Sequence, residues 1–339
     1  MWAIRNRTPY GVGSTWGRTK DGVHEWIVAV RATFDIGPQG KVTLADEQPV
    51  PLLLAEHVGE EGASSLRYEA DLISPKPTTD ILLNGTAYAP GGRPTTQFPV
   101  TLRVDGREKV LRVLGTRVYV SHGTEVLPSH PAPVTEVPVV YERAFGGFDK
   151  ADPDPTRQRM DARNPVGCGV AADPRRLIEK PAHNFEYPDG NPAETGPAGF
   201  GPIASYWSPR RELQGTYDKA WEEGRKPLLP LDWDPASLLC APADQRAPQH
   251  LRGGELVQLR NLTRDGRLDL VLPKIYPVFT TYFATVSGRR LEEHRARLAT
   301  VVLEPDQARL AMVWTTALLV HADVDYLDET VVREKAYIS

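Results

Sequence analysis

The sequence predicts a mainly β protein: antiparallel, sandwich-like or barrel-like β regions joined by a long irregular middle segment, with few short helices. Both ends of the chain contain short runs in which apolar and polar residues alternate, the period typical of half-exposed strands. Asp-Gly pairs between such runs favour tight hairpin turns. The 339 residues also include 31 prolines. That share is well above the usual ~5% and disfavours long helices.

Residues 1–145 are predicted to form an N-terminal antiparallel β region. Its clearest strand covers 25–36, where apolar residues occupy the even positions and polar residues most of the odd ones. This alternation predicts one buried face and one exposed face. Asp105 and Gly106 supply the turn of a hairpin at 101–115. Further strands are expected at 79–89, 117–120 and 137–142.

Residues 146–255 are predicted to form an irregular segment rich in proline, glycine and aromatic residues. Between 196 and 235, prolines and glycines interrupt the chain so often that neither a long helix nor a regular strand can persist. The same stretch holds too much apolar surface for a disordered linker. Its large aromatic residues are Phe200, Tyr206, Trp207, Tyr217, Trp221 and Trp233. We therefore expect an ordered, non-repetitive segment, a kind that is usually functional.

Residues 256–339 are predicted to return to β structure. Strands and hairpins are expected, in chain order, at 261–273, 278–286 and 298–320. The segment 289–298 fits either an exposed strand or a short helix. Residues 325–336 are the best helix candidate, because Leu327 and Val331 would share one side of a helix.

The composition is that of a soluble globular protein, with 40% hydrophobic and 25% charged residues. A net charge of −4 argues against a broad nucleic-acid interface, which normally needs a basic face. The N-terminus lacks the apolar core of a signal peptide, and no run approaches the ~18 apolar residues of a membrane helix. We therefore expect a cytoplasmic protein with no membrane partner. Cys168 and Cys240 have no metal-site or disulfide spacing and are predicted to be reduced thiols.

Few residues indicate catalysis or cofactor binding. The eight histidines are scattered, without a His-x-His or His-Glu-x-x-His pair, so no metal site is predicted. No cofactor is expected, because the sequence contains no complete dinucleotide fingerprint. Asp232 and Asp234 flank Trp233, as paired carboxylates of a glycosidase could flank an aromatic platform. Asp followed by Pro is, however, ordinary turn chemistry, and this interpretation is the stronger one.

The main candidate site is an aromatic and arginine-rich surface in the middle segment. Such residues dominate protein interfaces, because they give large, rigid contact areas at low entropic cost. The candidates are Trp207, Arg210, Tyr217, Asp218, Trp221 and Arg225. Alternatively, the aromatic side chains fill the junction between the two β regions, since tryptophan is equally at home in cores. Sequence alone leaves both alternatives open.

Several motifs resemble a bacterial family of unknown function, domain of unknown function 2169. Between residues 199 and 262 these motifs are GFGPI at 199–203, WSPR at 207–210, GTYDKAW at 215–221, RKPLLP at 225–230, DQ at 244–245 and LRGGELVQLRNL at 251–262. Upstream they are KPTTDILLNGTAYAP at 76–90, YERAFGG at 141–147 and NPVG at 164–167. The motifs follow the order of the family and cover most of the chain.

The resemblance implies a role in type VI secretion. Members of this family are encoded beside VgrG spike proteins and PAAR-like effectors, which implies an adaptor or chaperone that loads an effector onto the spike. We therefore expect a binding protein, not an enzyme, with a PAAR-like effector as its direct partner and VgrG as its indirect partner. Two alternatives are a carbohydrate-active β-sandwich enzyme that uses Asp232 and Asp234, and a structural component of the spike or baseplate.

Overall fold

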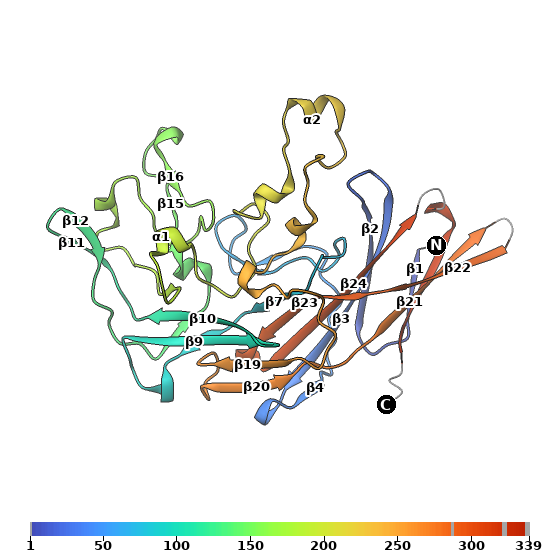
Figure 1. Ribbon diagram of the computed structural model, residues 1–339, viewed down its shortest axis with the longest axis horizontal. Coiled ribbons are helices and arrows are strands. Elements are labelled where there is room, and N and C mark those ends of the chain that lie inside the picture. Colours follow the sequence, from blue (N-terminus) through green and yellow to red (C-terminus); the bar gives the residue numbers. More distant parts are fainter. Residues whose placement is uncertain (1, 286–287, 321–323, 336–339) are drawn as a thin grey trace.

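The computed structural model of the protein confirms the mainly β fold, in which most strand pairs are antiparallel. The structure describes residues 2–285, 288–320 and 324–335. The molecule is elongated, with three larger sheets distributed along its long axis (Figure 1). The α-helices of the described residues are short, as expected: α1 (Pro192–Thr195) and α2 (Lys219–Gly224).

A six-stranded sheet forms the centre of the molecule and combines strands from both ends of the chain. In spatial order they are β2 (Gly11–Arg18), β3 (His24–Ile36), β24 (Arg309–Val320), β23 (Arg297–Glu304) and β7 (Asp80–Leu83), while β4 (Val42–Leu44) pairs with β3. The two strands expected within 298–320 are confirmed as β23 and β24. A turn at Pro305–Gln307 joins them.

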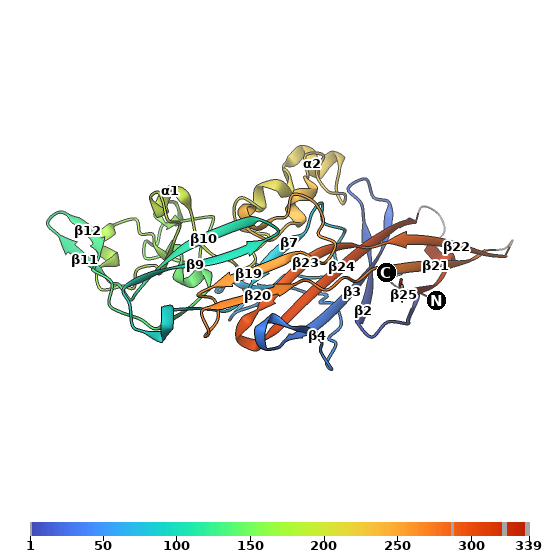
Figure 2. The same ribbon diagram turned by 60° about the horizontal axis from the view of Figure 1, so that its bottom comes forward.

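A five-stranded sheet packs against the central sheet, and together they form a sandwich (Figure 2). Its strands are β18 (Phe185–Glu186), β10 (Arg107–Leu114), β9 (Gln97–Val104), β19 (Leu256–Arg260) and β20 (Arg267–Val271). The hairpin predicted at 101–115 is confirmed here as β9–β10. The hairpin predicted at 261–273 forms as β19–β20, but its first strand lies before that range, and residues 261–266 form the loop. In the first, Asp105 and Gly106 have φ values of 48° and 81°, which fits a type I′ turn.

A four-stranded sheet lies at the end of the molecule that holds the N-terminus (Figure 1). It contains β1 (Ala3–Asn6), β25 (Leu327–Glu334), β21 (Pro277–Thr285) and β22 (Gly288–Arg295). The helix predicted at 325–336 is therefore wrong, because Leu327–Glu334 form β25; residue 336 lies outside the described residues. It pairs in parallel with β1 and antiparallel with β21, and these long-range pairings override a weak helical pattern.

Strand β3 differs from the prediction of one exposed face, because Glu25 to Phe34 are all buried. The even positions enter the main core, as expected. Segment 45–75 covers the odd positions and gives some of their polar groups partners. Arg31 donates to Asp71 at 2.8 Å, and the backbone N–H of Thr33 donates to Gln48 Oε1 at 3.0 Å.

The rest of the chain forms short ladders and turns around the sandwich. The paired strands are β5 (Glu56–His57) with β6 (Leu66–Tyr68), β8 (Thr86–Tyr88) with β13 (Glu136–Pro138), β11 (Tyr119–His122) with β12 (Glu125–Pro128), β14 (Phe145–Gly146) with β17 (Cys168–Gly169), and β15 (Phe148–Asp149) with β16 (Arg159–Met160). The strand expected at 79–89 is split between β7 and β8. Because strands from both ends of the chain share sheets, the predicted regions 1–145 and 256–339 are not separate sheets.

Candidate protein-interaction site

Two of the six predicted interface residues lie in the core. Trp207 is 1% exposed and packs edge-on against Tyr141, with ring centroids 5.7 Å apart. Arg210 is 4% exposed; its Nε donates to the carbonyl of Ser237 at 2.7 Å, and its guanidinium pairs with Glu69. Because both side chains are enclosed, they anchor the middle segment to the segments around Glu69 and Tyr141 and are not available to a partner.

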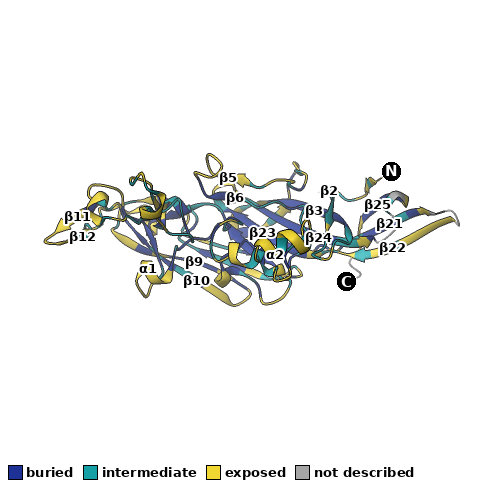
Figure 3. Ribbon diagram, turned by 90° about the horizontal axis from the view of Figure 1, so that it is seen from above, coloured by how far each residue is buried: buried dark blue, intermediate teal, exposed yellow. Residues whose placement is uncertain are grey.

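The other four candidates lie on a projection that stands out from the sandwich. We call residues 215–234, which include α2, the α2 projection; it extends above the sheets and is mostly exposed (Figures 1 and 3). Gly215 at its base has a φ of 85°, and a Cβ there would lie 2.7 Å from Cβ of Pro230. Only glycine fits this close approach without a shift, which explains the glycine that opens the GTYDKAW motif.

Three of the candidates make the α2 projection rigid. Asp218 accepts the backbone N–H of Trp221 at 2.9 Å and so caps α2. Trp221 donates from Nε1 to the carbonyl of Leu228 at 2.8 Å, which closes the loop after the helix. Arg225 donates from Nη2 to the carbonyl of Lys20 at 2.7 Å and pairs with Asp21 at 3.0 Å. These contacts fasten the projection to the turn between β2 and β3.

The exposed apolar surface of the projection comes from Tyr217 and Leu231. Tyr217 is 52% exposed and stacks edge-on against Trp221, with ring centroids 4.8 Å apart. Leu231 is 73% exposed, and the ammonium group of Lys20 donates to its carbonyl at 3.2 Å. Sequence analysis missed Leu231, because a leucine among prolines gives no signal that it faces water. Fixed backbone and exposed apolar side chains favour binding, since little entropy is lost when a partner docks.

The carboxylates considered for glycosidase chemistry are engaged in local hydrogen bonds. Asp232 accepts the N–H of Thr216 at 3.0 Å and its hydroxyl at 2.7 Å. These hydrogen bonds, that of the N–H first, lower the pKa of Asp232, whereas a general acid needs a raised pKa. Asp234 accepts the N–H of Ala236 at 2.8 Å and caps the turn that follows. Asp234 therefore has the turn-cap geometry that the Asp-Pro pair predicts, whereas Asp232 joins the two ends of the α2 projection.

A buried lysine explains another motif of the middle segment. Lys109 on β10 is enclosed, and its ammonium group donates to the carbonyl of Gly199 at 2.7 Å, to Asp244 at 2.9 Å and to Gln245 at 2.7 Å. Burial lowers the pKa of Lys109 to about 8, and the charge of Asp244 opposes that shift. Sequence analysis did not single out Lys109. Its contacts show that the Asp-Gln pair at 244–245 attaches the middle segment to the five-stranded sheet.

A second buried ion pair lies beside one of the two cysteines. Lys76 donates to Asp80 at 2.7 Å and to Thr300 at 2.9 Å, and the N–H of Cys240 donates to the same carboxylate at 2.8 Å. Burial raises the pKa of the Cys240 thiol to about 12, so this thiol is not an activated nucleophile. Cys168 and Cys240 are both free. No group of three or more His, Cys, Asp or Glu residues that could hold a metal occurs in the described parts of the chain.

One known protein family matches most of the chain. The model of a family described as an uncharacterized protein conserved in bacteria, DUF2169, matches residues 21–315. The chain belongs to the DUF2169 family. The match includes the α2 projection, the five-stranded sheet and most of the central sheet, whereas β1, β2 and β25 of this DUF2169 protein lie outside it. No curated protein and no solved structure matches the chain. Across residues 2–285, 288–320 and 324–335, no helix is long and apolar enough to span a bilayer.

Proposed function

We propose that this DUF2169 protein is a bacterial, cytoplasmic adaptor that binds a PAAR-like effector and assists its loading onto a VgrG spike. The resemblance of its motifs to a family encoded beside such genes motivates the choice of partner. The observation that carries a binding role is the α2 projection, which holds two exposed apolar side chains, Tyr217 and Leu231, on a rigid frame. The mechanism is complementary binding, with no chemical step.

The proposed adaptor needs a larger contact than the projection alone. A stable protein complex buries on the order of 1,600 Å² in total. In this proposal the exposed apolar residues of the projection act as anchors at the centre of the contact, and the neighbouring polar side chains of α2 form its rim. Trp207 and Arg210 support the frame from within the core and make no contact with the effector.

Co-purification with a co-expressed PAAR-like effector from the same genome tests the proposal. We expect the wild-type chain to retain that protein, and the double variant Tyr217→Ala/Leu231→Ala to lose about 2–4 kcal/mol of binding free energy, the range of interface hot spots. The matched control is Tyr326→Ala/Leu256→Ala, which removes an exposed tyrosine and an exposed leucine elsewhere. Failure of the wild-type chain to retain the partner, or equal retention by both double variants, would contradict the proposal.

A further inference from the structure

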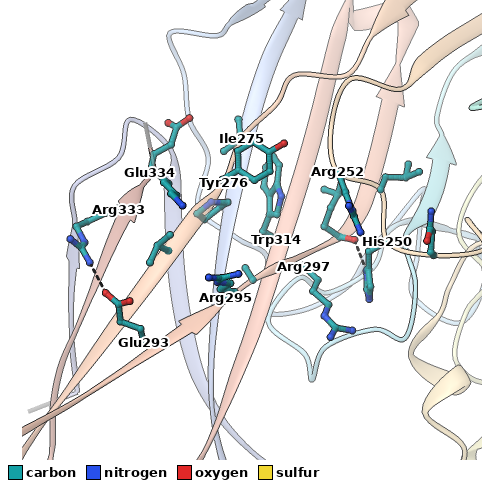
Figure 4. Close-up of a pocket in the computed structure, with 17 residues that line it drawn as sticks. His250, Arg252, Ile275, Tyr276, Glu293, Arg295, Arg297, Trp314, Arg333 and Glu334 are labelled. Atoms are coloured by element: carbon teal, nitrogen blue, oxygen red, sulfur yellow. Dashed lines mark hydrogen bonds and ion pairs between the residues drawn. The ribbon is translucent and has the colours of Figure 1, made fainter. Parts of the chain in front are cut away.

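A cleft of about 820 Å³ opens where the four-stranded sheet meets the central sheet (Figure 4). Its walls come from residues 249–252, 275–278, 295–298 and 333–335, with Trp314 of β24 beneath them. It shares no lining residue with the α2 projection. The volume lies in the range of typical ligand pockets and has room for several residues of a peptide.

The floor of the cleft is apolar and fixed in place. Ile275 and Trp314, each 4% exposed, form its base, and the half-buried Val278 and Ala296 provide its accessible apolar surface. The loop that carries His250 is anchored on both sides: the N–H of Leu251 donates to Thr79 Oγ1 at 2.9 Å, and His250 Nδ1 lies 3.1 Å from the carbonyl of Leu298. A ligand would therefore meet a preformed apolar surface, which lowers the entropic cost of binding.

The rim of the cleft is basic in a chain whose net charge is −4. The cationic side chains that line the cleft are Arg252, Arg295, Arg297, Arg333 and Lys335. They face two carboxylates, and both of these have partners: Glu293 pairs with Arg333 at 3.2 Å, and Glu334 accepts the Tyr10 hydroxyl at 2.7 Å.

Part of this positive charge is not neutralised by the chain itself. Within the described residues, the guanidinium groups of Arg252, Arg295 and Arg297 have no carboxylate within ion-pair distance and no hydrogen-bond acceptor. His250 also leaves a polar atom unused: its Nε2 is buried and has no hydrogen-bond partner among the described residues. The cleft thus offers uncompensated cations above an apolar floor.

The positions of the charges favour an extended ligand. Figure 4 shows Arg333 and Arg252 at opposite ends of the cleft, with Arg295 and Arg297 between them. A single phosphate or carboxylate would need donors that converge on one point, whereas these cations are spread out. Nucleic acid fits less well, because Trp314 is too enclosed to stack on a base.

We infer that this cleft binds an extended acidic peptide segment of a partner protein. Apolar side chains of the segment pack on Val278 and Ala296, and its carboxylates pair with Arg252, Arg295 and Arg297. Alternating acidic and apolar residues suit this arrangement, because successive side chains of an extended peptide point to opposite sides. This site is independent of the proposed adaptor function and of the α2 projection.

Fluorescence anisotropy with a labelled peptide of alternating glutamate and valine tests the site. We expect the full chain to bind this peptide, with an affinity that falls as salt is added, and not to bind the same peptide with lysine in place of glutamate. Arg295→Gln/Arg297→Gln should raise Kd at least about tenfold, because two charge-assisted contacts are lost. The control, Arg157→Gln/Arg175→Gln, changes two arginines that lie outside the cleft and are 74% and 82% exposed, and should bind as the wild type does.

Further variants keep the result interpretable. Arg252 lies on a separate wall of the cleft, and Arg252→Gln should also raise Kd for the peptide. This variant tests the site if Arg295→Gln/Arg297→Gln has a lowered melting temperature. Tyr217→Ala/Leu231→Ala should bind the peptide normally, so that failure of this site and failure of the adaptor proposal are distinguishable. The inference is overturned if the wild type does not bind the acidic peptide, if the arginine variants bind like the control, or if only a single-stranded oligonucleotide binds in an Arg295- and Arg297-dependent way.

Discussion

At the scale of single residues, two aromatic side chains of the middle segment differ in burial and therefore in their expected role. Trp207 is enclosed in the core beside Tyr141, whereas Tyr217 is half exposed on the α2 projection. Trp207→Ala should therefore cost about 3–5 kcal/mol of unfolding free energy, the cost of a large cavity. Tyr217→Ala should cost only about 1 kcal/mol, because it removes one ring contact with Trp221. Chemical denaturation of the two variants measures the difference, and equal losses would contradict the assignment of Trp207 to the core and Tyr217 to the surface.

At the scale of elements, the α2 projection is a separately stabilised unit. Asp218→Ala removes the cap of α2 and should cost about 1 kcal/mol locally. We expect faster amide hydrogen exchange across 215–234 and an almost unchanged melting temperature, because few residues of the projection enter the core. Asp173→Ala is the matched control, since Asp173 caps a turn elsewhere. Faster exchange throughout the sandwich in Asp218→Ala would show that the projection is not a separate unit.

At the scale of the whole molecule, a half-buried histidine links two sheets. His294 of β22 is hydrogen-bonded to Thr281 of β21 at 2.8 Å and to Thr316 of β24 at 3.0 Å. Burial lowers the pKa of His294 to about 4, below the usual value of about 6.5. The folded state thus resists protonation, so the stability present above pH ~6.5 is progressively lost as the pH falls toward ~4. This lowering of the His294 pKa corresponds to about 3 kcal/mol of unfolding free energy, which is present above pH ~6.5 and lost below pH ~4.

The pH dependence of unfolding free energy tests this link between the sheets. His294→Gln should be less stable at neutral pH, because it loses at least one of the two hydrogen bonds, but its stability should change less between pH ~6.5 and ~4. His122→Gln on the exposed β11–β12 hairpin is the control and should keep the wild-type profile. If His294→Gln shows the same acid sensitivity as the wild type, another group carries it.

Local features of the fold could be predicted because a few adjacent residues determine them. Asp105 and Gly106 adopt positive φ values in a tight turn whatever surrounds them, so the β9–β10 hairpin was predictable. The even positions of β3 alternate with polar residues, and they do face the core. In the candidate site, the sequence likewise identified Trp221 and Asp218 as members of an ordered segment, because prolines and aromatics together exclude both regular structure and disorder.

Only the tertiary structure decided which surfaces face water and which segments pair. The odd face of β3 is buried because segment 45–75 folds over it, and β25 is a strand because β1 and β21 supply its partners. The basic cleft joins Arg252, Arg295 and Arg333, which are far apart in the chain. Burial and strand pairing depend on contacts between segments that are distant in the chain. A local pattern of residue types does not indicate which distant segment packs against it or pairs with it. The sequence by itself therefore determined the turns, the strand-rich class and the ordered middle segment, and the packing of remote segments decided the rest.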